Sequence, residues 1–305
     1  MSFDTTMRRG GVLADWRLRH QSGIEEARHN VRVFLRDKLA VAGLIVILAT
    51  LIIAIFAPCL APFPEQGRGD SDMQHRLQPP SAKNIMGTDQ QGRDVLSRIM
   101  FGARIPLIIS FVVTAGVLLV GVPLGGIAGY FGGWVDEVVM RITDVFLAFP
   151  ALVFAMALVA FLGASLRNVA LALVITWWPW YARLVRSMAV SLRERPYVLA
   201  AKTMGVSHFT IIRRHILPNT IGPVIVQMTV DVGAVILEVA ALSFIGLGAK
   251  PPTPEWGLMV SEGREYILSA WWLSTFAGIA IFGLVLAYNL VGDALRDVLD
   301  PRLKR

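Results

Sequence analysis

The stretch IPLIISFVVTAGVLLVGVPLGGIAGYFGGWV, residues 105–135, contains no charged side chain. An α-helix rises 1.5 Å per residue, so about 20 apolar residues are enough to cross a hydrocarbon core about 30 Å thick. A strand of a transmembrane barrel would instead alternate apolar and polar residues over about ten positions. The stretch therefore predicts a membrane-spanning helix. Small residues that let a neighbouring helix approach closely recur along it: Gly116, Gly121, Gly125, Gly126 and Gly129.

The rest of the chain has the same character. Of its 305 residues, 55% are hydrophobic and 17% are charged, and the mean hydropathy is +0.59, far from the balance of a soluble protein. A further apolar run, 220–249, carries the acids Asp231 and Glu238. We predict an all-α, polytopic membrane helical bundle with six transmembrane helices. The four remaining runs are uncharged and lie at residues 39–57, 145–166, 168–182 and 266–292.

The distribution of Lys and Arg predicts the orientation. With the N-terminus inside, 20 of the 29 Lys and Arg residues fall on the inner side and nine on the outer side. The excess of positive charge in cytoplasmic segments then places both termini and the segment 193–219 in the cytoplasm. The first apolar run begins only at Leu39, too late and too long for a cleavable signal peptide, so we expect it to remain as a span.

The spans divide the chain into five parts. The outer loop ends in a segment whose apolar residues Val95, Leu96, Ile99 and Met100 have helical spacing, which predicts a short helix on the outer surface. The core contains five transmembrane helices and the cytoplasmic segment 193–219. The parts are a cytoplasmic N-terminal segment 1–38, a first transmembrane helix 39–58, an extracytoplasmic loop 59–104, the core 105–293 and a cytoplasmic tail 294–305.

Several kinds of site are not expected. The single cysteine, Cys59, excludes an intramolecular disulfide and any site with several thiolates, and the five histidines are scattered, so no metal site is predicted. The net charge of +7 follows the membrane topology, without the aromatic-interleaved basic patch typical of nucleic-acid binding. We interpret the aromatic cluster at 177–181 as an interfacial anchor, and Arg141 can pair with Asp144 on a helix surface.

One polar island interrupts the apolar pattern: RPYVLAAKTMGVSHFTIIRRHILPN, residues 195–219. Pro196 suits the first turn of a helix, and Gly205 ends that helix after two small alanines. Ser207 can cap a second helix that reaches Leu217, where Pro218 stops it. The pattern predicts a helix, a glycine turn and a second helix, shaped to enter a groove on a partner. An amphipathic helix on anionic lipid is the alternative.

The island resembles the cytoplasmic coupling loop of binding-protein-dependent ABC importer permeases. That loop has Glu-Ala-Ala, three residues and Gly, then nine residues to Ile-x-Leu-Pro. Two positions depart from the pattern, because Leu199 stands where the Glu is expected and His215 where the Ile is. The resemblance implies that the following residues couple this chain to an ATPase: Ala200, Ala201, Lys202, Thr203, Met204, Gly205, Val206, Ser207, Leu217 and Pro218.

Four other stretches carry a more specific resemblance: GTDQQGRDVLSR (87–98), GGWVDEVVMRITD (132–144), LSFIGLGAKPPTPEWG (242–257) and GDALRDVLDPRLK (292–304). Together they resemble the second permease of the dipeptide, oligopeptide and nickel group. The resemblance implies a type I ABC importer permease fold in the bacterial cytoplasmic membrane. It also implies three kinds of partner: a second permease, two ATPases and an extracytoplasmic solute-binding protein. The solute is expected to be a di- or oligopeptide, with nickel, glutathione or an opine as alternatives.

The chain lacks the G-x-x-x-x-G-K-[ST] phosphate loop that would bind ATP. We therefore expect no catalytic residue and no cofactor in this chain, and ATP and Mg to be used by the partner ATPase. Two other classes of protein remain as alternatives. A membrane protease is disfavoured because H-E-x-x-H is absent and LVGD at 290–293 lacks the first glycine of the aspartyl motif. A transporter acting alone would show inverted symmetry or broken helices around a midplane site.

The acids in the apolar run 220–249 are the remaining candidates. Asp231 and Glu238 are two helical turns apart, so they share one face, about 10 Å from each other along the axis. Ionisable groups at membrane depth face a polar cavity or a partner. The two acids are therefore candidates for a translocation path, and a structural hydrogen bond or ion pair at a helix interface is the equal alternative.

Overall fold

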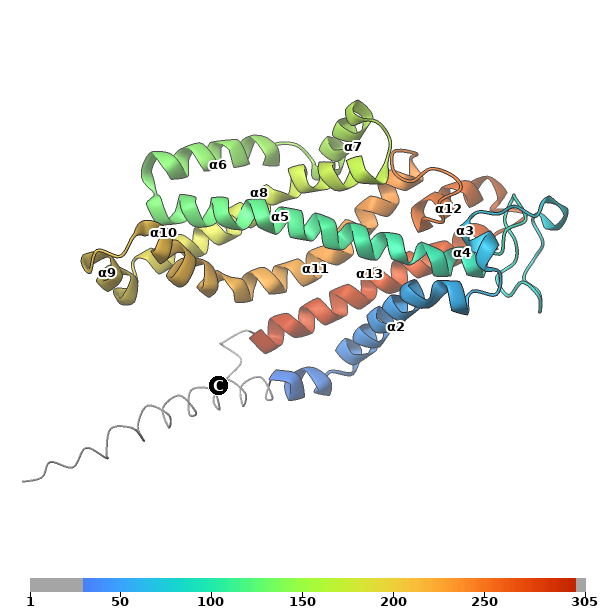
Figure 1. Ribbon diagram of the computed structural model, residues 1–305, viewed down its shortest axis with the longest axis horizontal. Coiled ribbons are helices and arrows are strands. Elements are labelled where there is room, and N and C mark those ends of the chain that lie inside the picture. Colours follow the sequence, from blue (N-terminus) through green and yellow to red (C-terminus); the bar gives the residue numbers. More distant parts are fainter. Residues whose placement is uncertain (1–29, 300–305) are drawn as a thin grey trace, which may run out of the picture.

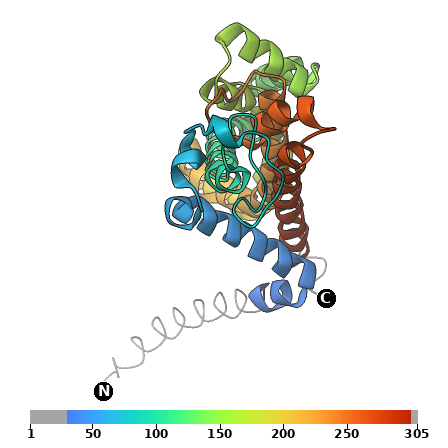
Figure 2. The same cartoon turned by 90° about the vertical axis from the view of Figure 1, so that its right-hand side faces the viewer.

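Helices make up the computed structural model, which describes residues 30–299 (Figures 1 and 2). Within that range, β structure consists of one isolated bridge between Thr88 and Asp94. The all-α prediction is therefore confirmed. Two parts of the chain lie outside the described residues: residues 1–29 of the N-terminal segment 1–38, and residues 300–305 of the tail.

The elements, in chain order, are α2 (Lys38–Leu60), α3 (Pro64–Arg68), η1 (Met73–His75), α4 (Val95–Gly102), α5 (Arg104–Phe131), α6 (Gly133–Leu147), α7 (Ala151–Leu162), α8 (Leu166–Arg193), α9 (Pro196–Thr203), α10 (His208–Ile211), η2 (Ile212–Ile216), α11 (Leu217–Phe244), α12 (Trp256–Gly263), η3 (Arg264–Tyr266) and α13 (Trp272–Leu299).

The expected six spans are not reproduced as six apolar helices. By length and composition, four helical stretches of the described chain can cross a membrane: Lys38–Leu60, Val95–Phe131, His208–Phe244 and Trp272–Val298. A fifth is present if α6 and α7 together form one span. Although α8 is 28 residues long, Trp, Pro, Tyr and Arg residues in its second half lower its hydropathy, so it is not among them.

The run 145–166 does not form the single helix that the sequence analysis predicts. The chain leaves α6 after Leu147 and enters α7 at Ala151, and the two helices are bent by 84°. Pro150 lies at the break. Proline lacks a backbone N–H and disfavours helical geometry in the residue before it, here Phe149, so the helix cannot continue through this point.

Glycines in α5 allow it to pack tightly on α8, as the sequence predicts. A Cβ atom added at Gly121 would lie 2.6 Å from the carbonyl oxygen of Trp178, and one at Gly129 would lie 2.6 Å from that of Arg186. At Gly125, between them, the added atom would contact the carbonyl oxygen of Ala182. These glycines recur every four residues and therefore form one smooth stripe along the helix.

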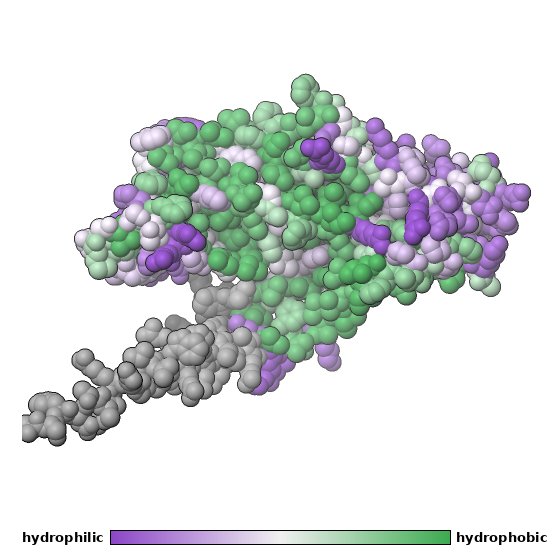
Figure 3. Space-filling model, in the orientation of Figure 1, coloured by the Kyte–Doolittle hydropathy of each residue, from purple (hydrophilic) through white to green (hydrophobic). Residues whose placement is uncertain are grey.

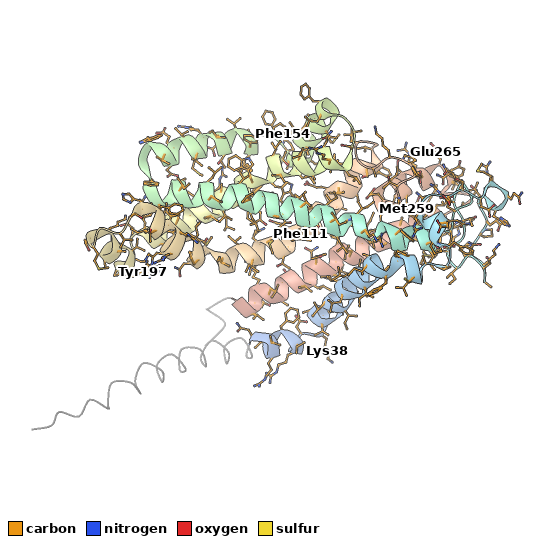
Figure 4. All side chains as sticks on the ribbon, in the orientation of Figure 1. Lys38, Phe111, Phe154, Tyr197, Met259 and Glu265 are labelled. Atoms are coloured by element: carbon orange, nitrogen blue, oxygen red, sulfur yellow. The ribbon has the colours of Figure 1, made fainter. Side chains whose placement is uncertain are left out.

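Hydrophobic residues cover the middle of the molecule, and hydrophilic ones gather over α3, α4 and the loops at one end (Figure 3). Tyr197 of α9 lies at the opposite end of the long axis from Glu265 (Figure 4). The start of α2 and the end of α13 point toward the α9 end (Figure 1). The long axis is thus the direction in which the bundle crosses a bilayer.

Candidate functional site

The polar island folds into an elbow, residues 196–216, at one end of the molecule (Figure 1). Helix α9 begins at Pro196 and ends at Thr203, and Gly205 follows with φ +75°, in the left-handed region that favours glycine. Ser207 then caps α10, its hydroxyl accepting from the backbone N–H of Thr210 at 3.3 Å. The chain thus reverses at Gly205, around which there is open space.

Contacts with the ends of α5 and α8 fix the elbow in place. Val198 and Ala201 of α9 are buried in a cluster with Tyr130 of α5 and Ala189 of α8. The Tyr130 hydroxyl lies 2.8 Å from Nδ1 of His208, and the Lys202 ammonium lies 4.9 Å from the centre of the Tyr130 ring. A movement of the elbow would therefore displace α5 and α8 as well.

The outer surface of the elbow contains large apolar side chains that are exposed. Met204 is 75% exposed and Phe209 is 72% exposed. Among the residues that the sequence analysis assigns to coupling, Ala201 is buried, and Val206 and Leu217 are half-buried. The others are exposed at this end of the molecule: Ala200, Lys202, Thr203, Met204, Gly205, Ser207 and Pro218.

Pro218 does not stop the second helix, contrary to the sequence prediction. It lies in the first turn of α11, and helical structure runs without a break from His208 to Phe244. The residues before it, Ile212–Ile216, form a π-helical turn. A proline is tolerated there because the first turn of a helix has N–H groups without helical partners. The elbow and the acid-bearing helix are consequently one continuous element.

Both intramembrane acids contact α8. The Tyr181 hydroxyl donates to Oδ2 of Asp231 at 2.7 Å, and the Gln227 amide donates to Oδ1 at 2.9 Å. The Trp177 indole N–H donates to Oε2 of Glu238 at 2.9 Å. In the described part of the chain, no Lys, Arg or His pairs with either carboxylate. The hydrogen-bond alternative of the sequence analysis is thus present, without a cation.

The interpretation of residues 177–181 as an interfacial anchor is wrong for most of the cluster. Trp178 and Tyr181 are buried, and Trp177 and Tyr181 direct their polar atoms to the acids of α11. Only Trp180, 57% exposed, lies on the surface. The signal that could have found these contacts is the spacing. Trp177 and Tyr181 are one turn apart on a helix that runs antiparallel to α11, so both face the acids.

A pocket of about 610 Å³ opens beside Asp231, between α8 and α11. Asp231 is half-buried, and it is the one carboxylate among the described residues that line the pocket. The pocket is lined by Trp177, Trp180, Arg183, Leu184, Ser187, Gln227 and Asp231. Glu238 is not part of this lining, so the structure separates the two acids: one contacts a pocket and the other lies only at the helix interface.

Two ion pairs hold α6 against α8 beside this pocket. Arg183 donates to Asp144 at 2.7 Å, and Arg186 forms two hydrogen bonds with the Asp136 carboxylate, the longer at 2.9 Å. The expected pair between Arg141 and Asp144 is not formed, because Asp144 pairs with Arg183 and the nearest acid to Arg141 is Glu137, at 3.8 Å. Asp144 therefore pairs across helices, while Arg141 pairs along its own helix with Glu137.

At the opposite end, a buried charge network fastens the outer loop to α12. Asp89 accepts from Arg93 at 2.6 Å and from Arg98 at 2.7 Å, and Arg98 also reaches Glu262 at 3.0 Å. Arg93 and Asp89 are fully buried. Burial lowers the pKa of Arg93, as does the nearby Arg98, while Asp89 and Glu262 act in the opposite direction. Sequence reasoning missed this network: Asp89, Arg93 and Arg98 are close in the chain, but Glu262 lies 164 residues after Arg98.

The helix expected in the loop 59–104 is present as α4, but it packs against α12 and does not lie on the surface. Val95 and Arg98 are buried, and the indole N–H of Trp256 in α12 donates to the carbonyl of Ile99 at 3.0 Å. In residues 30–299, no group of three or more His, Cys, Asp or Glu is placed to hold a metal ion.

Apolar helices that cross the molecule, acids held in their interior and a fixed elbow at one end define a helical subunit of a membrane transporter. The comparisons give its family. The chain belongs to the binding-protein-dependent transport system inner membrane components, whose sequence model matches residues 121–305. Residues 28–80 match the N-terminal transmembrane domain of oligopeptide transport permease C. The resemblance drawn from the sequence is thus confirmed.

Curated relatives match over most of the chain. The dipeptide transport system permease protein DppC of Alkalihalophilus pseudofirmus is 48% identical over 269 residues, 88% of each chain. The probable D,D-dipeptide transport system permease protein DdpC of Escherichia coli is 44% identical, over 87% of this chain and 88% of that one. The glutathione transport system permease protein GsiD of Pectobacterium atrosepticum is 42% identical, over 90% of both.

The fold is also found in a solved structure. A chain of the inward-facing MetNI methionine ABC transporter superimposes with a TM-score of 0.52 at 20% identity, covering 66% of this chain and 96% of that chain. This likeness concerns the fold of the bundle. The protein is therefore a permease subunit with an ABC importer permease fold.

Proposed function

We propose that this permease forms half of the translocation path of an ATP-driven importer for dipeptides or similar short peptides. The observation that carries the proposal is the continuous helix His208–Phe244, which joins the exposed elbow to the acids Asp231 and Glu238. A transporter that moves solute uphill needs two access states and a source of energy. A helix that links an external contact surface to the interior can transmit movement between them.

The proposed partners follow from what this chain presents and lacks. Its exposed apolar elbow surface, with Met204 and Phe209 at its centre, has the size and character of a helix that inserts into a groove. Two ATPase subunits, which use ATP and Mg, would bind such elbows on this chain and on a second permease. An extracytoplasmic binding protein would deliver the peptide to the opposite end. We place the assembly in the bacterial cytoplasmic membrane, with the elbow in the cytoplasm.

A dipeptide is the preferred solute because two relatives are named for dipeptide transport, at 48% and 44% identity. Glutathione is the second candidate, because a relative named for glutathione transport is 42% identical over 90% of this chain. Glutathione is itself a short peptide, so both candidates require the same kind of path. Uptake of a radiolabelled dipeptide into liposomes that contain the whole transporter, with glutathione as competitor, would distinguish them.

The coupling role is tested at Gly205. The Gly205→Val variant places a branched side chain at φ +75°, which strains the turn. We expect normal membrane insertion but loss of peptide uptake and of ATPase co-purification. Gly246→Val is the matched control, because Gly246 has φ +87° and also has open space around it, but lies just after α11, at the other end of that helix. Normal uptake by Gly205→Val, or equal loss by both variants, would contradict the proposal.

A further inference from the structure

The pocket between α8 and α11 contains a carboxylate whose charge has no counter-ion in the described chain. Asp231 accepts from the Tyr181 hydroxyl and from the Gln227 amide, and both donors are neutral. An ionised carboxylate has about four acceptor sites, so two remain for another donor. At membrane depth, an ionised group is stable only beside a cation or in a polar cavity.

Two arginines of α8, one in the lining of this pocket and one next to it in the chain, already pair with acids of α6. Arg183 lines the pocket, but its guanidinium donates to Asp144 of α6 at 2.7 Å. Arg186, the residue before the lining residue Ser187, is held by two hydrogen bonds to Asp136. Asp231 is therefore without a cationic partner among residues 30–299 and remains available to a cation from another molecule.

The walls of the pocket also suit a small organic cation. Trp177 and Trp180 both line it, and the faces of indole rings attract ammonium groups. The orientation of Trp177 is fixed, because its indole N–H donates to Glu238 at 2.9 Å. The volume of about 610 Å³ lies in the range of sites for small molecules and exceeds what a single ammonium group requires.

We propose that this pocket binds the free α-ammonium group of the transported peptide, with Asp231 as its counter-ion and the two tryptophans as its walls. The inference rests on the proposed function and adds which end of the peptide this subunit binds. The ammonium group of a peptide in transit would then form an ion pair with Asp231, which lies on the helix that begins at the elbow. The competing occupant is a Lys or Arg side chain of the paired permease.

Binding is measured on the purified complex of both permeases and both ATPases, without the binding protein, by saturation-transfer difference NMR. The probes are L-Ala-L-Ala and N-acetyl-L-Ala-L-Ala, which differ in the ammonium group. The variants are Asp231→Asn, which removes the charge with little change of shape, and Asp231→Glu, which keeps it. Glu137→Gln is the matched control, because Glu137 is an exposed acid on α6, away from the pocket.

With the unaltered complex, we expect a transfer signal for L-Ala-L-Ala at least fivefold above that for the acetylated peptide. Asp231→Asn should lose this difference, Asp231→Glu should retain it in part, and Glu137→Gln should retain it in full. Equal signals from the two peptides, or an unchanged signal in Asp231→Asn, would overturn the inference. Dissociation of the two permeases in Asp231→Asn would also overturn it, because it would assign the pocket to a partner side chain.

Failure of this inference is distinguishable from failure of the proposed function. Uptake of the dipeptide into liposomes by the unaltered complex with its binding protein tests the function alone. If uptake is observed while the two peptides give equal signals, only the pocket assignment is wrong.

Discussion

At the scale of single residues, the buried charges at the outer end depend on one carboxylate. Asp89 accepts hydrogen bonds from both Arg93 and Arg98, whose other nitrogen atoms include several without a hydrogen-bond partner in the described residues. Glu262 is the second acid, and its contact with Arg93 is longer, at 3.6 Å. Removing Asp89 would therefore leave two buried guanidinium groups with one counter-ion, Glu262, which is within hydrogen-bond distance of Arg98 alone.

We expect Asp89→Asn to destabilise the protein by roughly 3–5 kcal/mol, because breaking a buried ion pair leaves an uncompensated charge. The midpoint of thermal unfolding of the purified protein measures the effect. Glu65→Gln is the control, since the Glu65–Arg68 pair is exposed and exposed pairs contribute little. A midpoint for Asp89→Asn equal to that of the control would show that the network does not hold the loop.

The same scale explains why part of the site could be predicted from the sequence and part could not. Asp231 and Glu238 were found because acids are rare in apolar runs. Their partners Trp177 and Tyr181 were assigned to an interface instead, because aromatic residues near an arginine are typical of a membrane boundary. The one-turn spacing of Trp177 and Tyr181 places both on one face of α8, but no local pattern shows that this face meets α11.

At the scale of elements, the stripe of glycines decides how closely α5 and α8 pack. Tight packing was predictable, because small residues at helical spacing serve this purpose in membranes. The partner helix was not, since the run 168–182, which lies in α8, is the shortest of the six expected spans. The bend at Pro150 was also missed: hydropathy gives a run of apolar residues, but it does not show where the helix within the run is broken.

The Gly125→Ala variant adds one methyl group where the carbonyl of Ala182 leaves no room. We expect a loss of stability of roughly 1–3 kcal/mol, as for other overpacked interfaces, seen as a lower midpoint of thermal unfolding. Gly283→Ala in α13 makes the same change in open space and should be neutral or stabilising, because alanine favours a helix. A control that loses as much stability as Gly125→Ala would refute the packing explanation.

At the scale of the whole molecule, the bundle has two polar ends of different kinds. One contains the elbow with its exposed cations and apolar surface, and the other contains the loops locked by Asp89. The class of fold was predictable from hydropathy alone. The excess of Lys and Arg on one side predicts that the elbow lies in the cytoplasm. That orientation is a property of the molecule in its membrane and is open to a direct test.

Cysteine labelling provides this test, because Cys59 is the single cysteine of the chain. In a Cys59→Ser background, Lys83→Cys marks the outer loop and Lys202→Cys marks the elbow, and both positions are exposed. We expect a membrane-impermeant maleimide to label position 83 in intact cells and position 202 only in inverted vesicles. Labelling of position 202 from outside would reverse the orientation and exclude contact between the elbow and a cytoplasmic ATPase.

The π-helical turn at Ile212–Ile216 also sets the angular position of the acids. A turn of this kind contains one more residue than an α-helical turn, and each residue rotates a helix by about 100°. The extra residue therefore shifts the faces of the long helix relative to the elbow, including the face that meets α8 through Tyr181 and Trp177. The direction in which Asp231 points is decided at the elbow, some fifteen residues earlier in the chain.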